Sequence, residues 1–345
     1  MAVRTAITTG WLLRGGDGRL TAYAPASGGL LRWTQNRPGG PEWTGPQHLE
    51  VPGLEPYLSI ARTAEGYVYV AGLRRRTHED GRTETDVVYS TQFQPGRAMT
   101  NWRTIGTPYG RDWDKAGRIG FPVAAADTTG LHLYFRNAGG GVSGRRQDAR
   151  GIWGPWLDLA GSRVADSGSA AVTDDGRIEL AVPGPDHVLR WRQEEPGTQP
   201  QRTANTAVKA VPGSFSSAPV GEGRIAHFWR TEGDGVLHVR IGDDVRALPS
   251  LGGGSGPVAA LGGVLAQRAD SGRVQVAAYR PGSEPGDVSW TDTGADCVGA
   301  PALAHDGAGR LTLAAIAPDG GLCLTHRQGE DGAAFGAWAR VQQTG

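Results

Sequence analysis

Cysteine and long hydrophobic runs are scarce in this chain, and each shortage limits what the protein can be. The 345 residues include only two cysteines, too few for the disulfide framework of a small secreted domain. No segment approaches the roughly 20 consecutive apolar residues of a membrane-spanning helix, and the first residues lack the apolar run of a signal peptide. We therefore expect a cytoplasmic protein without a membrane partner, unless it is secreted by another route or the chain is a trimmed form.

A surplus of charge is missing as well. The 35 basic residues balance 35 acidic ones, so the formal net charge is zero. Proteins that bind nucleic acid usually carry a clustered basic surface. The most basic run here, Arg74–Arg76, is followed by Glu79 and Asp80, so it belongs to a mixed-charge loop. We expect no nucleic-acid partner.

Helical patterning is hard to find, whereas glycine (55 residues) and proline (22 residues) are abundant. In their place the pattern Gly-x-apolar-x-apolar recurs seven times, once with His in its last position. Its glycines lie 37 to 64 residues apart, at Gly18, Gly66, Gly130, Gly176, Gly223, Gly272 and Gly309. Two-residue alternation is typical of strands, and a repeat of this length is typical of propellers and other repeat architectures.

The repeat predicts an all-β fold, a seven-bladed β-propeller of four-stranded antiparallel blades around a central tunnel. A four-stranded sheet cannot bury both faces alone, but sheets packed face to face around an axis can. We expect one domain over residues 1–345, with blades of roughly 1–53, 54–117, 118–163, 164–213, 214–253, 254–296 and 297–345.

Two blades depart from the mean length. Blade two is long, with a charged loop from Arg74 to Asp86 and an insertion from Pro108 to Gly117. Blade six is short, so we expect it to lack a full strand or to have very tight turns. We expect the segment around Trp11 to begin blade one, and the ring to close where Phe335 to Val341 pack beside that blade.

The two cysteines, Cys297 and Cys323, fall on the first and third strands of the last blade in this frame. Strands one and three of a sheet lie roughly 9–10 Å apart, whereas a disulfide needs Cα atoms within about 7 Å. We predict two free thiols.

Candidate ligand-binding residues come from the third strands, five of which align on a glutamine. These are Gln35, Gln92, Gln147, Gln193 and Gln328. Two positions before a glutamine stand Trp33, Trp191, Arg145 and His326. A tryptophan face can stack on the apolar face of a sugar ring. We therefore expect a ligand site to include these four residues and Trp113, which lies in the blade-two insertion, where rim loops often carry specificity.

The fourth strands add a second pattern, best seen in blade three. It carries Trp153, Trp156, Leu159 and Gly161 after Gln147. Partial copies occur elsewhere, at Trp43, Trp102, Ile105, Gly106, Trp338 and Val341. With these residues the chain resembles the bacterial seven-bladed β-propeller lectins of the Photorhabdus type and, more loosely, tachylectin and tectonin repeats. The resemblance implies sugar binding. The double tryptophan is confined to blade three. The chain therefore departs from such lectins, which gain from many near-identical sites.

Local catalytic and metal motifs are absent. The chain has no Gly-x-Ser-x-Gly, no P-loop and no His-x-x-x-His, so we expect no cofactor and no metal, and we assign no catalytic residue. Carboxylates that could form a glycosidase pair exist, among them Glu55, Asp112, Asp114 and Glu179, but nothing local selects them.

Three functions remain open. The first is a lectin-like propeller that binds a carbohydrate or another small molecule. The second is an enzyme of a specialised-metabolite pathway, with one active site at the tunnel mouth. The third is a protein-interaction scaffold. The shape of the site separates them, because they predict shallow clefts between blades, one deep asymmetric cavity, and a flat apolar patch, respectively.

Overall fold

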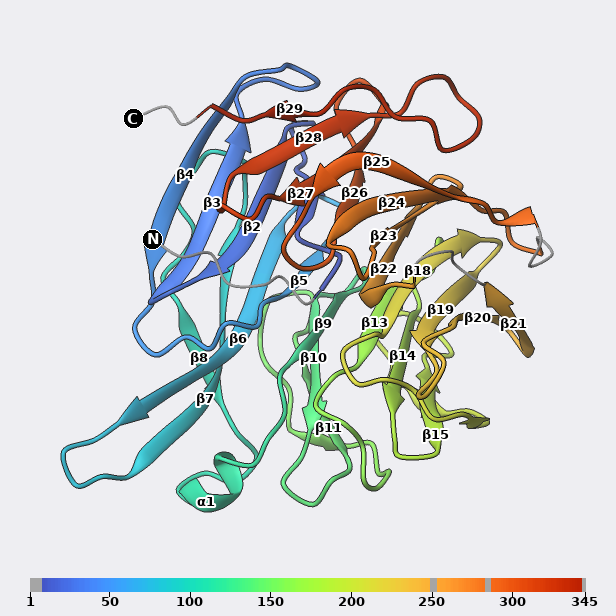
Figure 1. The fold of residues 1–345 in the computed structure, drawn as a ribbon. Helices are drawn as coiled ribbons and strands as arrows, with labels where there is room; N and C mark the ends of the chain where they lie inside the picture. Colours follow the sequence, from blue (N-terminus) through green and yellow to red (C-terminus); the bar gives the residue numbers. More distant parts are fainter. Residues whose placement is uncertain (1–7, 249–252, 283–286, 343–345) are drawn as a thin grey trace.

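Short alternating strands form seven antiparallel sheets, arranged in chain order around one axis (Figure 1). The computed structural model describes residues 8–248, 253–282 and 287–342; the outermost parts of the predicted domain, 1–7 and 343–345, lie outside this range. Each sheet has four strands in chain order, and blade four has a further short strand, β17, paired with β15. The all-β seven-bladed propeller is therefore confirmed.

The strands of blades one to three are β1 (Leu12–Arg14), β2 (Leu20–Ala26), β3 (Gly29–Gln35), β4 (Trp43–Glu50), β5 (Ser59–Arg62), β6 (Val68–Thr77), β7 (Thr83–Gln92), β8 (Arg103–Gly106), β9 (Val123–Ala126), β10 (Leu131–Arg136), β11 (Val142–Arg146) and β12 (Leu157–Asp158). A short helix, α1 (Trp113–Ala116), follows β8.

The strands of blades four to seven are β13 (Ser169–Val172), β14 (Ile178–Pro183), β15 (His187–Arg192), β16 (Gln201–Arg202), β17 (Thr206–Ala207), β18 (Ser216–Gly221), β19 (Arg224–Arg230), β20 (Leu237–Ile241), β21 (Asp244–Leu248), β22 (Ser255–Leu261), β23 (Val264–Arg268), β24 (Arg273–Ala278), β25 (Trp290–Asp296), β26 (Ala302–His305), β27 (Leu311–Ile316), β28 (Leu322–His326) and β29 (Ala339–Arg340).

The first strand of each blade lies nearest the axis. Neighbouring first strands from β5 to β26 contact one another in order, and β1 contacts β26. Hydrophobic side chains fill the spaces between adjacent blades, because each sheet presents an apolar face to its neighbour. Any site near the axis is therefore built from the first strands and the segments that lead into them.

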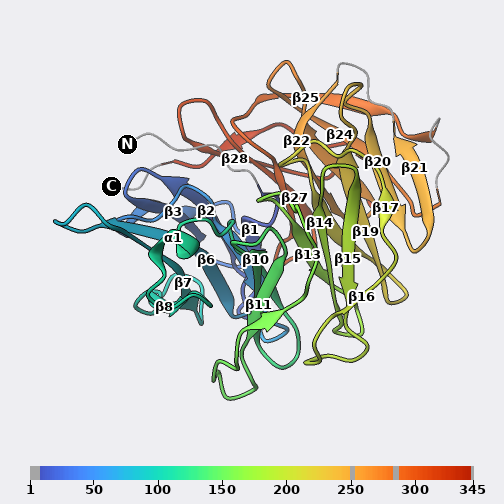
Figure 2. The same ribbon diagram turned by 90° about the horizontal axis from the view of Figure 1, so that it is seen from below.

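The ring closes by packing between two complete blades, blade one (blue) and blade seven (red), which lie side by side in Figures 1 and 2. Trp11, just before β1, is buried and donates its indole N–H to the Ala300 carbonyl of blade seven at 2.9 Å. Val341, after β29, belongs to the same hydrophobic cluster as Trp11 and Trp33. No strand is exchanged between the two ends in the described residues.

The glutamines at the ends of the third strands of blades one to four hold those blades together. Gln193 accepts from the Ile178 N–H at 2.7 Å and donates to the Thr198 carbonyl at 2.9 Å. Gln35 makes the equivalent bonds to Leu20 and Gly40. These glutamines are buried, so their recurrence reflects the need to pair the backbone groups of a turn.

Blade seven is an exception in this alignment. Gln328 is exposed, and the backbone N–H of Arg327 bonds to Leu311 where Gln193 bonds to Ile178 in blade four. The sequence alignment of this strand is therefore wrong by one residue. His326 pairs with Thr312 across the sheet, as Arg192 pairs with Glu179, so His326 does not share the position of Trp33 and Trp191.

Blade six has four strands, β22 to β25, so the alternative of a missing strand is wrong. The other alternative, tight turns, agrees with the connection between β22 and β23, where only Gly262 and Gly263 separate the paired Leu261 and Val264. Gly272 precedes the third strand β24, whereas in the other blades the repeated glycine precedes the second strand. The short spacing arose because the pattern matched a different strand of this blade.

Blade two also differs from its prediction. The segment predicted as a charged loop is a hairpin extension of β6 and β7, in which Arg74 pairs with Asp86 and Arg76 with Glu84. The Arg76 guanidinium lies 2.6 Å from the Glu84 carboxylate. This hairpin projects beyond the ring beside α1, at the lower left of Figure 1.

Both cysteines are free thiols, as predicted. Cys323 lies on β28, but Cys297 lies in the connection after β25 and not on a first strand. Burial raises the pKa of the Cys297 thiol to about 11, which makes it an inert thiol at neutral pH.

Candidate functional site

A cavity of about 370 Å³ opens at one end of the axis, where the first strands of blades two to five begin. Its wall includes Tyr57, Ser59, Phe121, Ser169, Phe215 and Ser217. The volume lies in the range of small-molecule sites. Four blades and the segment 8–10 before β1 contribute different side chains, so this is an asymmetric cavity, the shape expected for a site at the tunnel mouth.

Aromatic rings and hydroxyl groups both line this cavity. Tyr57 and Phe121 stack face to face, with ring centroids 4.6 Å apart. Burial raises the pKa of Tyr57 to about 12, so its hydroxyl stays protonated at neutral pH. This combination suits a ligand that has an apolar face and several hydroxyl groups.

Two of the serine hydroxyls are used to join blades. Ser59 accepts from the Ala124 N–H of blade three at 2.8 Å, and Ser216 donates to the Val258 carbonyl of blade six at 2.6 Å. Their side chains therefore have a structural role at the axis.

Ser217 differs, because its partner is a histidine. Ser217 on β18 and His227 on β19 are cross-strand neighbours, and the Ser217 Oγ lies 2.8 Å from the His227 Nδ1. The other ring nitrogen, His227 Nε2, lies 3.2 Å from the Glu179 Oε2 on β14 of blade four. A hydroxyl on the cavity wall is thus connected through a buried imidazole to a buried carboxylate.

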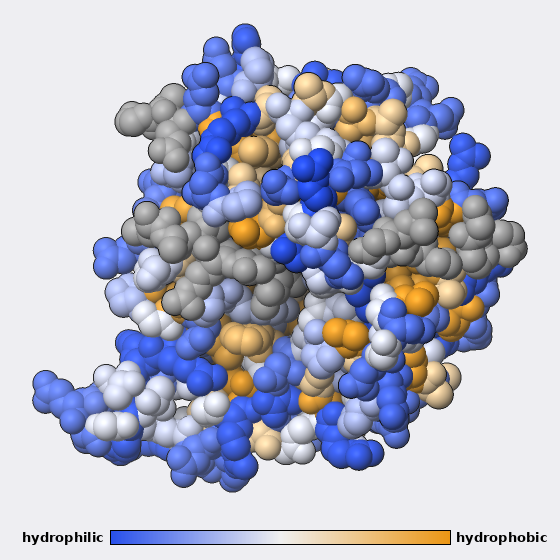
Figure 3. Space-filling view, in the orientation of Figure 1, coloured by the Kyte–Doolittle hydropathy of each residue, from blue (hydrophilic) through white to orange (hydrophobic). Residues whose placement is uncertain are grey.

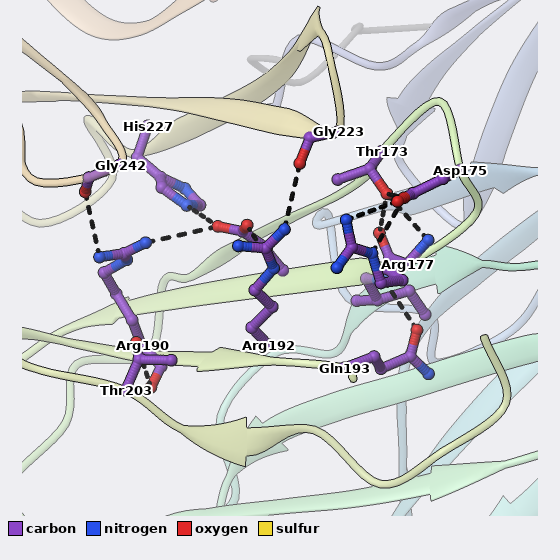
Figure 4. Close-up of polar contacts among 12 residues, drawn as sticks. Thr173, Asp175, Arg177, Arg190, Arg192, Gln193, Thr203, Gly223, His227 and Gly242 are labelled. Atoms are coloured by element: carbon purple, nitrogen blue, oxygen red, sulfur yellow. Dashed lines mark hydrogen bonds and ion pairs between the residues drawn. The ribbon is translucent and has the colours of Figure 1, made fainter. Parts of the chain in front are cut away.

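Two arginines of β15 complete the surroundings of Glu179. The Arg192 Nε lies 3.2 Å from one carboxylate oxygen and the Arg190 Nη2 lies 3.5 Å from the other. Figure 4 shows Arg190, Arg192 and His227 pointing toward one another across the boundary between blades four and five. Arg192 also donates to the Gly223 carbonyl at 3.2 Å, which ties the two blades together.

The charges of this cluster follow from its burial and contacts. Burial lowers the pKa of His227, an effect that the Glu179 hydrogen bond opposes without cancelling, so the imidazole is neutral at pH 7. Burial alone would raise the pKa of Glu179, but the His227 hydrogen bond and the two arginines outweigh it and lower that pKa. The stable form at neutral pH is a neutral imidazole beside a carboxylate.

A second buried histidine–carboxylate pair lies between blades three and four. His132 Nε2 is 2.9 Å from Asp127 Oδ2, and the two side chains are 1% and 0% exposed. His132 Nδ1 faces the hydroxyl of buried Tyr134 at 3.2 Å. Asp127 also accepts from the Gln193 amide and the Gly197 N–H of blade four. None of these side chains lines the axial cavity.

Trp33 and Trp191, the main sequence candidates for ligand binding, are each 1% exposed. Trp33 lies in the core shared by blades one and seven, and Trp191 donates its indole N–H to the Leu159 carbonyl at 2.9 Å. Packing between blades covers their rings, so neither offers a face on which a sugar could stack. This part of the expectation needs correction.

Trp113 is partly exposed on α1, where it packs against the blade-two hairpin. Its ring stacks with His78 at a centroid distance of 5.2 Å, and the Arg82 guanidinium lies 4.4 Å from the ring centroid. These contacts explain its place in the fold. A ligand role for Trp113 stays a prediction.

Arg145 and His326 are both partly buried and lie in different blades. Arg145 donates to the Gly154 and Ile105 carbonyls, both at 2.8 Å, and so links blade three to blade two. The His326 Nδ1 lies 3.0 Å from the Thr312 hydroxyl, and burial lowers the pKa of His326. The five sequence candidates therefore do not converge on one site, and ligand roles for these two stay predictions.

Grooves near the rim offer a second type of site. One of about 500 Å³ between blades three and four is lined by Arg146, Trp153 and Gln199. Ile152, at the same groove, is 56% exposed. On the face drawn in Figure 3, hydrophobic residues are dispersed among hydrophilic ones, and that face does not present the flat apolar patch expected of a scaffold.

Within the described residues, no group of three or more His, Cys, Asp or Glu side chains is placed to hold a metal ion. In the same part of the chain no helix is long and apolar enough to cross a membrane.

Among known proteins, this chain is similar in fold to several solved structures. No protein-family model and no curated protein sequence matches this chain. Among solved structures, the BP39L lectin from Burkholderia pseudomallei is similar, with a TM-score of 0.70 and 11% identity over 99% of this chain and 100% of that chain. A candidate 6-phosphogluconolactonase from Bacteroides uniformis has a TM-score of 0.58 and 13% identity, covering 92% of each chain. A mutant of AofleA from Arthrobotrys oligospora has a TM-score of 0.52 and 10% identity over 98% of this chain and 87% of that chain.

Sequence reasoning missed Ser217 and gave no role to His227 or Glu179. Glu179, Ser217 and His227 come from two blades and have no short spacing. The available signal was the position of His227, which takes the last place of the repeated pattern, where the other repeats have mainly apolar side chains; Glu179 gave no such signal, because its place on the second strand is held by Thr21, His132 and Thr312 in other repeats. That signal marks an unusual junction but does not identify its partner.

Proposed function

We propose that this protein binds a saccharide, or a small molecule that resembles one in its hydroxyl groups, in the axial cavity. The main support for this proposal is the cavity wall, in which the stacked Tyr57–Phe121 pair lies beside serine hydroxyls from several blades. A sugar has the matching chemistry, an apolar ring face and a set of hydroxyl donors and acceptors.

The similar propeller BP39L is named a lectin, which supports this class of ligand. The divergence of the blades favours one principal site in the axial cavity over seven equivalent sites, because the aromatic side chains of its wall come from blades two, three and five and its hydroxyl groups from a different set of segments, Thr8 and Thr9 before β1 included.

A glycan array on the full chain, followed by calorimetric titration of any hit, tests the proposal. We expect Phe121→Ala to weaken binding about tenfold, because it removes the half-buried aromatic face from the cavity. Ile152→Ala is the matched control, since it removes an exposed apolar side chain from the groove between blades three and four. Loss of binding in Ile152→Ala with full binding in Phe121→Ala would move the site to the rim groove. An array with no bound glycan would contradict saccharide binding.

A further inference from the structure

Ser217 is set apart from the other cavity serines by the base behind it. Its Oγ lies 2.8 Å from His227 Nδ1, and His227 Nε2 lies 3.2 Å from Glu179. Because a neutral imidazole carries one proton, the carboxylate at Nε2 selects the tautomer protonated there. The Nδ1 lone pair then accepts the Ser217 hydroxyl proton. This is the order of nucleophile, base and orienting acid found in serine-dependent acyl transfer.

Exposure decreases from Ser217 to His227 and Glu179, which is the order that such chemistry needs. Ser217 is partly exposed and lines the cavity, while His227 and Glu179 are buried behind it. The base is therefore shielded from solvent, and the hydroxyl can be reached by a ligand in the cavity. Arg190 and Arg192 hold the Glu179 carboxylate in place, so the imidazole has a fixed orientation.

We propose that Ser217 is a nucleophile, with His227 as its general base and Glu179 as the residue that orients His227, and that it cleaves a small carboxylic ester bound in the axial cavity. The preferred substrate class, an O-acylated saccharide, rests on the proposed function. The hydroxyls of Ser167 and Ser169 line the same cavity and can donate hydrogen bonds to a developing oxyanion.

The reaction balances with water as the only other reactant. The Ser217 Oγ forms a bond to the ester carbonyl carbon while its proton passes to His227 Nδ1. The carbon–oxygen bond to the alcohol then breaks, and the leaving oxygen takes the proton from His227. Water next attacks the acyl–Ser217 ester, giving one proton to His227, which returns it to the Ser217 oxygen as the carboxylic acid leaves.

The direct test is labelling of the full-length protein with a fluorophosphonate, with peptide mass mapping, alongside steady-state hydrolysis of p-nitrophenyl acetate. We expect the adduct on Ser217, and a fall in hydrolysis rate of about 100-fold or more in both Ser217→Ala and His227→Gln. Ser162→Ala, in an exposed loop, is the matched serine control and should label and react like the unmodified sequence.

Ser217→Cys keeps the inference testable if His227→Gln does not fold. Its new thiol lies beside the same base, so iodoacetamide should alkylate it faster at pH 7 than Cys323, whose pKa is raised by burial. Absence of an adduct at Ser217 in the folded protein, or equal hydrolysis by Ser217→Ala, overturns the inference.

Glycan binding separates this inference from the proposed function. If Ser217→Ala still binds a glycan that Phe121→Ala does not bind, and the original protein forms no adduct, saccharide binding stands and the nucleophile is rejected. If Ser217 is labelled but no glycan binds, the nucleophile stands and saccharide binding is rejected.

Discussion

Two buried histidine–carboxylate pairs lie at neighbouring blade junctions, and they differ in what each histidine meets on its second nitrogen. His132 Nε2 lies 2.9 Å from Asp127, and its other ring nitrogen faces the buried Tyr134 hydroxyl. His227 bonds to Glu179 and faces Ser217 on the wall of the axial cavity. The first pair is closed on all sides by protein, whereas the second ends at a cavity.

A buried histidine–carboxylate pair does not by itself indicate function. Asp127 accepts hydrogen bonds from Thr129, Gln193 and Gly197 as well as contacting His132, so its junction satisfies many buried donors at once. Glu179 instead restrains a base whose free nitrogen points to a reachable hydroxyl. A structural role follows from the first arrangement and a reactive one from the second.

The largest effect should come from breaking the His132–Asp127 pair, called the closed pair because protein surrounds it; the His227–Glu179 pair, which ends at the cavity, is the open pair. Asp127→Ala removes the acceptor for His132, Gln193 and Gly197 in a fully buried place, and we expect a loss of about 3–5 kcal/mol in unfolding free energy. Chemical denaturation of the variant and the original protein measures the difference. A loss below about 1 kcal/mol would show that the junction is not held by this carboxylate.

Breaking the open pair should cost less stability and more reactivity. Glu179→Gln leaves Arg190 and Arg192 without their anion, but Arg192 keeps its bond to Gly223, so we expect a loss of about 2–3 kcal/mol. Hydrolysis of p-nitrophenyl acetate should fall at least about tenfold, because the imidazole loses the carboxylate that fixes its tautomer. An unchanged rate in the folded variant would contradict the orienting role.

Acidification should lower the free energy of unfolding through the open pair, His227 and Glu179. The pKa of His227 lies below its ordinary 6.5 in the folded protein, so below pH 6.5 the unfolded chain binds the proton that the folded protein does not, and stability falls. The groups that face His227 are Ser217, Glu179, Arg190 and Arg240, and Glu179 adds a loss of the same sign at lower pH, because its pKa is lowered as well.

Unfolding free energies at pH 7, 6 and 5 measure this slope, to which His227 and His326, the latter also with a lowered pKa, can each contribute at most about 1.4 kcal/mol per pH unit. His227→Gln should reduce the slope and leave the part that His326 contributes. A variant with the original slope would mean that another group titrates in this range.

The smallest effects should come from the hydroxyls at the second nitrogens. Ser217→Ala and Tyr134→Phe each remove one hydrogen bond to a neutral imidazole, and each should cost about 1 kcal/mol. Ser217→Ala should abolish labelling, whereas Tyr134→Phe should leave it unchanged, because Tyr134 lies outside the axial cavity. Thermal unfolding and fluorophosphonate labelling of the two variants, measured together, check this contrast.

The sequence carried the fold because each blade repeats a local rule. Alternation after a glycine recurs in all seven blades, and a buried glutamine ends the third strand in blades one to four. Gln35 and Gln193 show why the chain keeps that glutamine, because each pairs backbone groups of its own blade. The rule failed where a similar pattern fell on another strand, as at Gly272, and where the strand slipped by one residue, as at Gln328.

The site was beyond this rule because it depends on departures from the repeat. Trp33 and Trp191 were chosen for their side-chain chemistry, but their position faces a neighbouring blade and not solvent. Ser217 meets His227 through strand pairing within blade five, but Glu179 reaches His227 only because blades four and five pack against each other. A contact across a blade junction has no sequence spacing of its own.

Histidine-selective ¹⁵N NMR of the full-length protein at pH 7 tests the account most directly. We predict that His227 is neutral, with its proton on Nε2 and a free Nδ1 that changes its shift in Ser217→Ala. In the same spectra the His132 signals should be unaffected by that substitution. A His227 that carries its proton on Nδ1, or that is an imidazolium at pH 7, could not accept the Ser217 proton and would contradict the account.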